Sequence, residues 1–481
     1  MNKNNQNKNI ISIILGAGKG ARMKSNIPKI LHLVNNKPLI YWLIKSIQII
    51  NPLKNILVVG HQYDEIKNYF QTNKELSNLF HKNQPSGILN FAFQERLLGS
   101  GDAVKSALNN IDKNYDGDIL VVCGDTPLLT SETISNLIEN HKKTDSAVTV
   151  LTAKVENPFG YGRVKKDKNN NIIKIIEEKD SDFDEKNIKE INSGVYCFKY
   201  KILKDYIHKI VPNEKTAEFY LTDIIEIIYK TGVKTKSFAT DNLAEILGIN
   251  DKVALFQANR EMRMRINKKF MLQGVEIINP ENIEIDENAK IGIDTIIYDG
   301  TIIRGKVEIG DNCKIETNSF IENSKIGNNT SIKYSYIIDS FVGNNCEIGP
   351  FSHIRPNTKI DDNCKIGNFT EIKNTYLAKG TKVSHLSYIG DSELGENVNI
   401  GAGTITCNYD GINKYKTIIK DNSFIGSNTN LIAPVIIGKN SIIGAGSTIY
   451  EDVPDNSLGI ERNKQINKKL MKPNHKPKNP K

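Results

Sequence analysis

The sequence predicts two domains of different fold: a Rossmann-like α/β domain with a mostly parallel sheet, then a left-handed parallel β-helix of hexapeptide repeats. The first half alternates short β-branched runs such as IISIIL and DILVVCGD with helical stretches such as PLIYWLIKSIQII, which is the pattern of strands joined by helices. From Ile285 onward, aliphatic residues recur at every sixth position. Neither a helix nor an ordinary strand has this period, whereas a β-helix turns one aliphatic residue of each hexapeptide inward.

The aliphatic positions of the repeat form four blocks with strict spacing. They are Ile285, Ile291, Ile297, Ile303, Ile309, Ile315 and Ile321; Val342, Ile348, Ile354, Ile360, Ile366 and Ile372; Leu377, Val383 and Ile389; and Ile425, Leu431, Ile437, Ile443 and Ile449. Three hexapeptides to a coil make roughly nine coils, about 40 Å long at a strand spacing of ~4.8 Å. Glycine often follows the aliphatic residue, as in Ile291-Gly292 and Ile366-Gly367, where we expect it to serve tight corners. The break from Thr404 to Ser423 is the clearest insertion, and insertions in such folds cluster where ligands bind.

Residues 251–273 contain helix formers throughout and neither proline nor glycine, so we expect a connecting helix there. The predicted domains are therefore residues 1–250 and 274–462, followed by a basic tail at 463–481. That tail holds seven lysines and no acidic residue, and we expect it to be disordered. No aromatic-studded basic groove accompanies it, so nucleic-acid binding is not expected.

The composition of the 481-residue chain excludes several classes of protein. No stretch approaches 18 consecutive apolar residues, so no membrane span is expected. The polar start MNKNNQNKN does not resemble a signal peptide, which predicts a cytoplasmic protein. The six cysteines are scattered without a CxxC pair, which predicts reduced thiols. Only three of the eight histidines lie beyond residue 208, too few for a three-histidine zinc site.

The segment ILGAGKGARMKSNIPKILH, residues 14–32, lies where a strand ends and a helix should begin. Its glycines let backbone N–H groups approach phosphates, and its cations neutralise them. No acidic residue precedes Asp64, which suits a polyanionic ligand. The segment resembles the L-x-x-G-x-G-T-R-[ML] and P-K signature of the sugar-1-phosphate nucleotidyltransferases. Here Ala21 replaces the usual threonine, which removes one hydroxyl contact, and Gly16 replaces an alanine.

Further matches to that family follow in its order: Gln94 before Gly99-Ser100-Gly101, then CGDTPL, FGYGR, Glu177, EINSG and GIN. The resemblance implies that Gln94 and Gly99 hold the uracil and that Gly162, Glu177 and Asn192 hold the sugar. It also implies that Asp125 and Asn250 bind Mg²⁺. The implied UTP and UDP-sugar site consists of Leu15, Gly18, Arg22, Lys29, Gln94, Gly99, Ser100, Gly162, Glu177, Asn192 and Asn250.

Two of these residues have a simpler interpretation when the resemblance is set aside. Asp125 ends an apolar strand, where an α/β sheet presents metal-binding carboxylates, but a turn or helix-capping aspartate fits the same pattern. Asn250 precedes the expected connecting helix and fits a helix cap. The implied reaction is an in-line attack by a sugar-1-phosphate oxygen on the α-phosphorus of a nucleoside triphosphate, releasing pyrophosphate. Since the attacking phosphate is already anionic, positioning and charge neutralisation by Mg²⁺, Lys29, Arg22 and the glycine-loop amides suffice.

Four motifs of the second half carry a second resemblance: PFSHIRPN at 350–357, EIK at 371–373, HLSYIGD at 385–391 and NIGAGTITCNYDG at 399–411. They resemble the acetyltransferase half of the bacterial bifunctional N-acetylglucosamine-1-phosphate uridyltransferases and glucosamine-1-phosphate acetyltransferases, which make UDP-N-acetylglucosamine for the cell wall. The resemblance covers nearly the whole chain and implies acetyl-CoA and UTP as co-substrates and a homotrimer formed through the β-helix. It assigns the catalytic base to His385, the sugar phosphate to Arg355, Lys373, Tyr388 and Asn399, and acetyl-CoA to Ala402, Asn408, Tyr409, Ser427, Ala445 and Arg462.

Acetyl transfer to an amine needs a base, because a protonated nitrogen has no lone pair to attack the thioester. A histidine titrates in the right range for this role. Taken alone, His385 also fits a histidine paired at a β-helix corner, and Arg355 and Lys373 fit solvated surface cations. A β-helix has flat faces and a narrow interior, so we expect the acetyl-transfer site between prisms packed around a threefold axis.

Two other functions stay open at this point. An adenylyltransferase of the glucose-1-phosphate type shares both folds but uses its β-helix for regulation; the motifs HLSYIGD and NYDG argue against it. A non-enzymatic scaffold would use the prism only to oligomerise; the surroundings of Asp125 and His385 argue against that.

Overall fold

The computed structural model describes residues 9–60, 62–81 and 89–469. Contacts divide the chain into two compact units, Met1–Met262 and Arg263–Lys481, and each is described by itself. The helix α9 (Lys252–Met271) lies in the stretch where the sequence predicts a connecting helix, while the predicted domain boundaries at 250 and 274 stay predictions. None of the helices formed by the described residues is long and apolar enough to cross a membrane.

The first unit is built on one sheet of nine strands, counted over the described residues, in the order β11-β7-β10-β6-β1-β4-β5, with β8 paired to β10 and β9 paired to β8. A short β2–β3 hairpin stands apart. The strands are β1 (Ile10–Leu15), β2 (Leu33–Val34), β3 (Lys37–Pro38), β4 (Lys54–Val59), β5 (Leu89–Phe93), β6 (Asp118–Cys123), β7 (Val148–Lys154), β8 (Arg163–Lys166), β9 (Ile172–Ile176), β10 (Glu190–Lys199) and β11 (Thr235–Ala239).

This sheet is mostly parallel, as predicted. The exception near its centre is β10, which runs antiparallel to its neighbours β6 and β7. The chain passes from β1 outward through β4 to β5 and then returns to place β6 on the other side of β1. The direction of winding therefore reverses between β1 and β6. Ligands of open α/β sheets bind at such a switch point, beyond the carboxyl ends of the strands.

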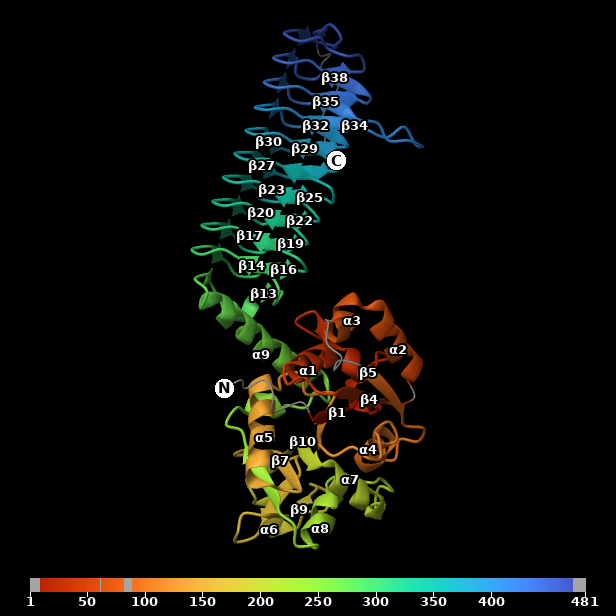
Figure 1. Cartoon of the computed structure of the whole chain (residues 1–481). Helices are drawn as coiled ribbons and strands as arrows, with labels where there is room; N and C mark the ends of the chain where they lie inside the picture. Colours follow the sequence, from red (N-terminus) through yellow and green to blue (C-terminus); the bar gives the residue numbers. More distant parts are fainter. Residues whose placement is uncertain (1–8, 61, 82–88, 470–481) are drawn as a thin grey trace, which may run out of the picture. The chain divides into compact units, whose positions relative to one another are not determined.

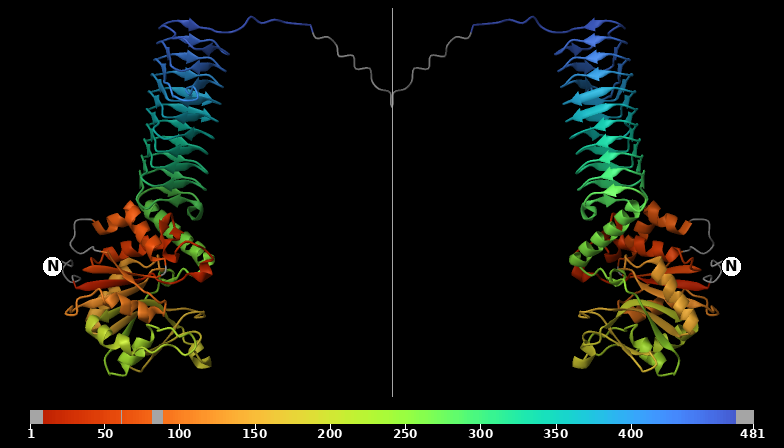
Figure 2. Two further views of the ribbon diagram at one scale, coloured as in Figure 1. Left: turned by 90° about the vertical axis from the view of Figure 1, so that its right-hand side faces the viewer. Right: turned by 90° about the vertical axis from the view of Figure 1, so that its left-hand side faces the viewer.

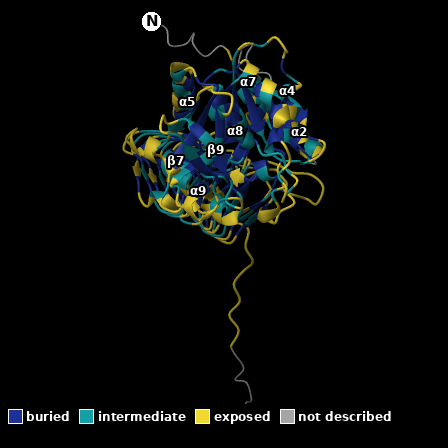
Figure 3. Ribbon diagram, turned by 90° about the horizontal axis from the view of Figure 1, so that it is seen from below, coloured by how far each residue is buried: buried dark blue, intermediate teal, exposed yellow. Residues whose placement is uncertain are grey.

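Helices cover both faces of the sheet. On one face, α4, α7 and α8 pack onto alternate residues of the strands, including Ile13, Val150 and Phe198, in a single apolar core. On the other face, His141 of α5 contacts Thr149, whose neighbours along β7 point into the first core. The helices are α1 (Leu39–Gln48), α2 (Tyr63–Thr72), α3 (Lys74–His81), α4 (Ser100–Leu108), α5 (Ser131–Thr144), α6 (Phe183–Lys186), α7 (Tyr200–Tyr206) and α8 (Asp223–Tyr229), with 3-10 turns η2 (Ala21–Met23), η3 (Lys29–Leu31), η4 (Ile207–Lys209) and η5 (Leu243–Ile246). Figure 3 shows the buried residues gathered around α8 and β9, with exposed residues at the rim.

The second unit is a parallel β-helix with three faces. Face 1 holds β12 (Glu276–Ile277), β15 (Ile296–Ile297), β18 (Lys314–Ile315), β21 (Ser331–Ile332), β24 (Glu347–Ile348), β27 (Lys365–Asn368), β30 (Lys382–His385), β33 (Asn399–Ile400), β36 (Phe424–Ile425), β39 (Ile442–Ile443) and β41 (Leu458–Gly459). Face 2 holds β13 (Glu284–Ile285), β16 (Ile302–Arg304), β19 (Phe320–Glu322), β22 (Tyr336–Ile338), β25 (His353–Ile354), β28 (Glu371–Lys373), β31 (Tyr388–Gly390), β34 (Ile405–Cys407), β37 (Asn430–Ile432) and β40 (Thr448–Ile449). Face 3 holds β14 (Lys290–Ile291), β17 (Glu308–Ile309), β20 (Lys325–Ile326), β23 (Phe341–Val342), β26 (Lys359–Ile360), β29 (Tyr376–Leu377), β32 (Ser392–Leu394), β35 (Thr417–Ile419) and β38 (Val435–Ile437).

The hexapeptide pattern accounts for this architecture. Every predicted aliphatic position except Ile291, which lies in the first coil, is buried inside the prism. Coiling also continues where the six-residue spacing slips, since β20 to β22 and β32 to β35 keep their places in the three faces. Figure 2 shows the strands stacked coil upon coil. The insertion forms a loop at 408–416, closed by a bridge between Tyr409 and Lys414, and Figure 1 shows it standing away from the prism beside β34.

The expectation that glycines after the aliphatic residues serve tight corners is wrong at most of these positions. Gly349 has a positive φ, whereas Gly292, Gly310, Gly367 and Gly401, which also follow an isoleucine of the repeat, do not. A Cβ on Gly367 would lie 1.7 Å from the Ser384 carbonyl oxygen of the next coil. These glycines therefore allow close stacking of coils, whereas asparagine supplies many of the left-handed corners, as at Asn312 and Asn329.

The predicted tail begins as extended, exposed chain at residues 463–469. Residues 470–481 lie outside the described part, so the prediction of disorder for them stays a prediction.

Candidate active sites

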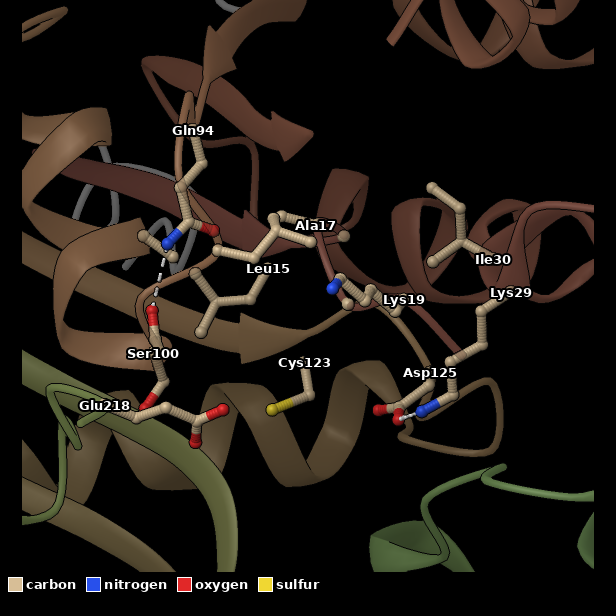
Figure 4. A pocket seen from close by; sticks show the side chains of 15 residues that line it. Leu15, Ala17, Lys19, Lys29, Ile30, Gln94, Ser100, Cys123, Asp125 and Glu218 are labelled. Atoms are coloured by element: carbon tan, nitrogen blue, oxygen red, sulfur yellow. Dashed lines mark hydrogen bonds and ion pairs between the residues drawn. The ribbon is translucent and has the colours of Figure 1, made fainter. Parts of the chain in front are cut away.

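A cavity of about 420 Å³ lies at the switch point of the first unit. It is lined by the glycine loop after β1, by the ends of β5 and β6, and by the start of α4 (Figure 4). The lining includes the predicted nucleotide residues Leu15, Gly18, Lys29, Gln94, Gly99 and Ser100, and the predicted metal ligand Asp125. Arg22, on η2, is exposed and is not among the lining residues.

Lys29 joins the two predicted metal ligands. Its ammonium group pairs with the Asp125 carboxylate (Figure 4) and donates a hydrogen bond of 2.8 Å to the Asn250 amide oxygen. The backbone supports this arrangement, because the N–H of Ile249 donates to the Asp125 carbonyl at 2.9 Å. Residues far apart in the sequence thus direct two oxygens at one cation.

The glycine loop leaves backbone exposed to the cavity. A Cβ built on Gly18 would meet nothing within 4 Å, so the chain there borders open space. Gly20 has a φ of 60° and turns the loop toward Lys29. Lys19 also lines the cavity, which adds a second cation next to the loop amides. This arrangement suits phosphate oxygens.

The predicted uracil residues form one hydrogen-bonded group. The Gln94 side chain is buried and donates to the Gly99 carbonyl at 3.1 Å and to the Asp102 carboxylate at 2.8 Å. Gly99 begins α4 with a φ of 103°, and the Ser100 hydroxyl accepts a hydrogen bond from the Leu221 N–H. Gln94 is therefore held against the turn that opens the helix.

The predicted sugar residues also meet. A Cβ on Gly162 would lie 3.6 Å from the Asn192 Cβ and 3.7 Å from Glu177 Oε1. The Asn192 N–H donates to the Gly162 carbonyl, and Thr222 donates to Glu177. Burial raises the pKa of the Glu177 carboxyl above its ordinary value. Burial, helped by Glu177, raises the pKa of nearby Asp223 to about 6.

In the β-helix, His385 ends β30 at the corner between faces 1 and 2. Its Nδ1 lies 3.2 Å from the Asn368 side-chain oxygen in the coil before. The equivalent position in the other coils of face 1 follows from the strand pairing. The buried aliphatic residue two places before it pairs with the corresponding aliphatic residue of the next coil, so these positions stack in a column. The resulting column contains Asn368, His385, Ala402, Ser427 and Ala445. Arg462 lies beside its last member, with its side chain near Gly444 and Gly446.

Predicted phosphate-binding residues lie on face 2. Arg355 and Lys373 follow paired isoleucines in adjacent coils, and Arg355 donates to Glu371 at 2.7 Å. Tyr388 extends over Gly390, since a Cβ there would lie 2.5 Å from its hydroxyl. The Lys373 ammonium stands close to Lys414 of the insertion loop and lowers the pKa of Lys414. Two adjacent ammonium groups repel each other unless an anion lies between them.

The remaining predicted residues of this half lie apart from these groups within one chain. Asn399 opens β33 on face 1, away from the strand that carries Tyr388. Asn408 is buried and donates to Asp391, and Tyr409 is exposed on the insertion loop. A single prism therefore distributes the predicted site over two faces and a loop.

Comparisons with known proteins cover both units. The nucleotidyl transferase model matches residues 11–243, the bacterial transferase hexapeptide model (six repeats) matches 288–323, and the GMPPB C-terminal domain model matches 336–475. The bifunctional protein GlmU of Geobacillus sp. (strain WCH70) is 45% identical over 457 residues, covering 95% of this chain and 96% of the relative. GlmU of Caldanaerobacter subterraneus subsp. tengcongensis is 45% identical over 459 residues, with the same coverage of both chains. The chain belongs to the GlmU family.

As a member of the GlmU family, the chain is a bifunctional enzyme. It transfers acetyl from acetyl-CoA to glucosamine-1-phosphate and uridyl from UTP to N-acetylglucosamine-1-phosphate, as the sequence predicts. The two alternatives, an adenylyltransferase and a non-enzymatic scaffold, are therefore not adopted.

Two residues of the candidate sites were missed in the sequence. Glu218 lines the nucleotide cavity and points its carboxylate toward Cys123 (Figure 4); its signal is an acidic residue in the stretch TAEFYLTD. Lys414 was missed although it lies in the insertion that the repeat pattern marks as a ligand site.

Burial raises the pKa of the Cys123 thiol to about 12, so this cavity residue is a neutral thiol.

Proposed function

We propose that the two reactions use two separate sites: the cavity between β1 and β6 for uridyl transfer, and the corner of the β-helix that carries His385 for acetyl transfer. The observation that carries the first assignment is the contact of one ammonium group, that of Lys29, with both Asp125 and Asn250. The observation that carries the second is the shared column of His385, Ala402, Ser427 and Ala445.

The donors at the first site fit Mg²⁺. Asp125 and Asn250 offer a carboxylate and an amide oxygen, the ligand types that this ion prefers, and both face the same point. The described residues contain no group of three or more His, Cys, Asp or Glu that could hold a metal ion. Mg²⁺ takes one or two protein ligands and completes its shell with water and substrate phosphates, so the carboxylate and the amide oxygen are enough protein ligands for it. When bound, the ion would neutralise charge developing on the triphosphate.

The chain's own residues then position the reactants. The glycine-loop amides and Lys19 face the triphosphate, and Lys29 lines the cavity beside Asp125 and Asn250, where its charge can pair with phosphate oxygens once those two side chains hold the ion. Gln94 and Gly99 hold the uracil, and Gly162, Glu177 and Asn192 hold the sugar. The sugar-phosphate oxygen attacks the α-phosphorus and pyrophosphate leaves, with no proton to be removed first.

In acetyl transfer, His385 takes a proton from the ammonium of glucosamine-1-phosphate. The freed amine attacks the thioester carbonyl, the carbon–sulfur bond breaks, and the CoA thiolate takes up a proton as it leaves. Arg355, Lys373 and Lys414 supply positive charge for the sugar phosphate, and Tyr388 lies between them and the His385 corner. The column from Ala402 to Ala445 gives the pantetheine arm a path along the prism.

We propose that three chains complete this second site. Two features support a trimer: the predicted residues lie on different faces of one prism, and an apolar ladder runs along the corner next to His385. The ladder consists of Tyr334, Phe351, Phe369 and Leu386 in successive coils, with Phe351 and Phe369 stacked 5.4 Å apart. Phe351 and Phe369 are 55% and 59% exposed. Exposed apolar surface of this kind marks an interface.

We also propose that the protein works in the cytoplasm, where UTP and acetyl-CoA are present. The six cysteines are free thiols, as expected in a reducing compartment.

One pair of variants tests both assignments. Asp125→Ala should abolish uridyl transfer and leave acetyl transfer near normal, and chelation of Mg²⁺ should do the same. His385→Ala should lower acetyl transfer by about 10²-fold to 10⁴-fold and spare uridyl transfer. Equal loss of both activities in either variant would contradict the separation of sites, and a loss below about tenfold for His385→Ala would remove its role as base.

A further inference from the structure

The first unit contains a buried cation that the proposed mechanism does not use. Arg163 begins β8 and is only 2% exposed. A buried guanidinium is costly unless its charge is paired and its donors are satisfied. Its partners are therefore informative about what this region of the chain must hold in place.

Arg163 connects a loop to the end of the neighbouring strand. Its guanidinium donates to the Tyr161 carbonyl and pairs with the Glu178 carboxylate at 2.5 Å. Glu178 also accepts a hydrogen bond of 3.0 Å from the N–H of Gly160. The two side chains thus fix the loop 160–162 from both ends, one through a carbonyl and the other through an amide.

The fixed loop borders the predicted sugar residues. Gly162 lies in it, and a Cβ there would lie 3.0 Å from Ile175 Cγ2, 3.6 Å from Asn192 Cβ and 3.7 Å from Glu177 Oε1. The Gly162 carbonyl accepts the N–H of Asn192 at 2.9 Å. Glu177 immediately precedes Glu178, so the same strand end carries both a sugar-contacting carboxylate and the partner of Arg163. A shift of the loop would therefore move Gly162 relative to Glu177 and Asn192, the other two predicted sugar residues.

We propose that Arg163 and Glu178 are positioning residues that hold Gly162 in the position required to bind the sugar of N-acetylglucosamine-1-phosphate. The inference rests on the proposed assignment of Gly162, Glu177 and Asn192 to the sugar. Both contacts come from the Nη1 group of Arg163, so one cationic nitrogen bridges the Tyr161 carbonyl and the Glu178 carboxylate. The buried Nε has no hydrogen-bond partner among the described residues, which leaves this bridge as the main compensation for burying the charge.

Two variants of the full-length enzyme test the clamp. Arg163→Met removes the nitrogen that bridges Tyr161 and Glu178, and Glu178→Gln keeps an acceptor for Gly160 but loses the ion pair. Because a displacement of about 1 Å can cost on the order of 10²-fold, we expect the KM for N-acetylglucosamine-1-phosphate to rise by about 10-fold to 100-fold. The KM for UTP and the rate of acetyl transfer should stay at the wild-type values. The double variant should show no higher KM for N-acetylglucosamine-1-phosphate than the single variant with the larger increase, since both residues act through one loop.

The control is Lys166→Met, which removes the ion pair between Lys166 and Glu190 at 2.6 Å on the same strand. It should leave the KM for the sugar phosphate unchanged. An unchanged KM in both clamp variants would overturn the inference. So would an equal rise in the KM for UTP, or a loss of uridyl transfer together with UTP binding, because either result would assign the pair to folding of the unit.

Glu177→Gln and Asn192→Ala separate this inference from the proposed function. If they leave the KM for the sugar phosphate unchanged, the sugar site itself is misassigned. If they raise it while Glu178→Gln does not, the sugar site stands and only the clamp is wrong.

Discussion

Replacement of Gly99 by alanine should disable uridyl transfer selectively. Gly99 precedes α4 with a φ of 103° and a ψ of 178°, a region that is open essentially to glycine alone and costs other residues about 1–3 kcal/mol. A Cβ there would lie 2.6 Å from the Phe219 carbonyl oxygen, 2.9 Å from the Phe219 nitrogen and 3.1 Å from the Glu218 Cβ. The two closest neighbours are backbone atoms, so no side-chain rotation can relieve the clash.

The size of the effect follows from these distances. Restoring ordinary contact requires the two segments to separate by about 1 Å. The segments are joined by hydrogen bonds from Phe219 N–H to the Leu98 carbonyl at 2.7 Å and from Gly101 N–H to the Phe219 carbonyl at 2.8 Å. A displacement of about 1 Å at a binding group can cost on the order of 10²-fold, or about 2.7 kcal/mol of transition-state stabilisation. We therefore expect kcat/KM for uridyl transfer to fall by about that factor.

The assay compares the two activities of one preparation: pyrophosphate release from UTP and N-acetylglucosamine-1-phosphate, and acetyl transfer to glucosamine-1-phosphate. The matched control is Gly232→Ala, at a φ of 82° with nothing within 4 Å of the added Cβ. It should lower stability by about 1 kcal/mol without loss of either activity. Wild-type uridyl transfer in Gly99→Ala, or an equal loss in Gly232→Ala, would refute the steric argument.

Three further predictions follow from particular contacts. A cut after Met262 should give a monomeric piece active in uridyl transfer and a trimeric piece active in acetyl transfer, measured by sedimentation and assay. A cut at Gln257 instead should lower the uridyl transfer of the N-terminal piece, because it removes Asn259, which accepts the Asn35 N–H at 2.9 Å. Equal uridyl transfer by the N-terminal pieces of the two cuts would contradict this. Asp223 has its pKa raised to about 6 from an ordinary 3.8 by burial and by neighbouring acids. The native state therefore binds more protons than the unfolded state between these values, and stability falls as pH rises through that window. Thermal inactivation of uridyl transfer in Asp223→Asn should then occur at a higher temperature than in wild type above pH ~6 and should match it below pH ~4; identical curves would remove the effect. Lys414→Met should raise the KM for glucosamine-1-phosphate in the acetyl transfer assay and leave the KM for acetyl-CoA unchanged. An equal rise in both KM values would argue against a contact between Lys414 and the sugar phosphate.

Much of the fold was predictable because its signals are local. A six-residue repeat of aliphatic residues has a single structural interpretation, and the structure buries all but one of those positions. The glycine loop after β1 was also predictable from its neighbours in sequence, and the structure places Gly18 at the cavity; its role toward phosphate stays a prediction, as do the roles of the EINSG and FGYGR segments. Even the column of His385, Ala402 and Ser427 follows from counting hexapeptides once the insertion is recognised, although the registers were needed to align it.

The sequence could not reveal the role of glycine in the coils. Pattern alone suggests corners, because glycine is the residue most tolerant of positive φ. Whether a position turns the chain or merely faces the next coil depends on the stacking of coils 17 or 18 residues apart, as at Gly367 and Ser384. The corners themselves fall to asparagines such as Asn312, whose short side chains tolerate the left-handed conformation.

By itself, then, the sequence determined which segments fold locally and which family signatures they carry, because periodicity and turn chemistry depend on residues a few positions apart. Only the tertiary structure decided which groups meet. Lys29 contacts Asp125 and Asn250 from 96 and 221 positions away, and Lys414 reaches Lys373 from a loop that no repeat constrains. Arg163 and Glu178 became a pair only when two antiparallel strands brought them together in a buried place, where an unpaired charge is too costly to keep.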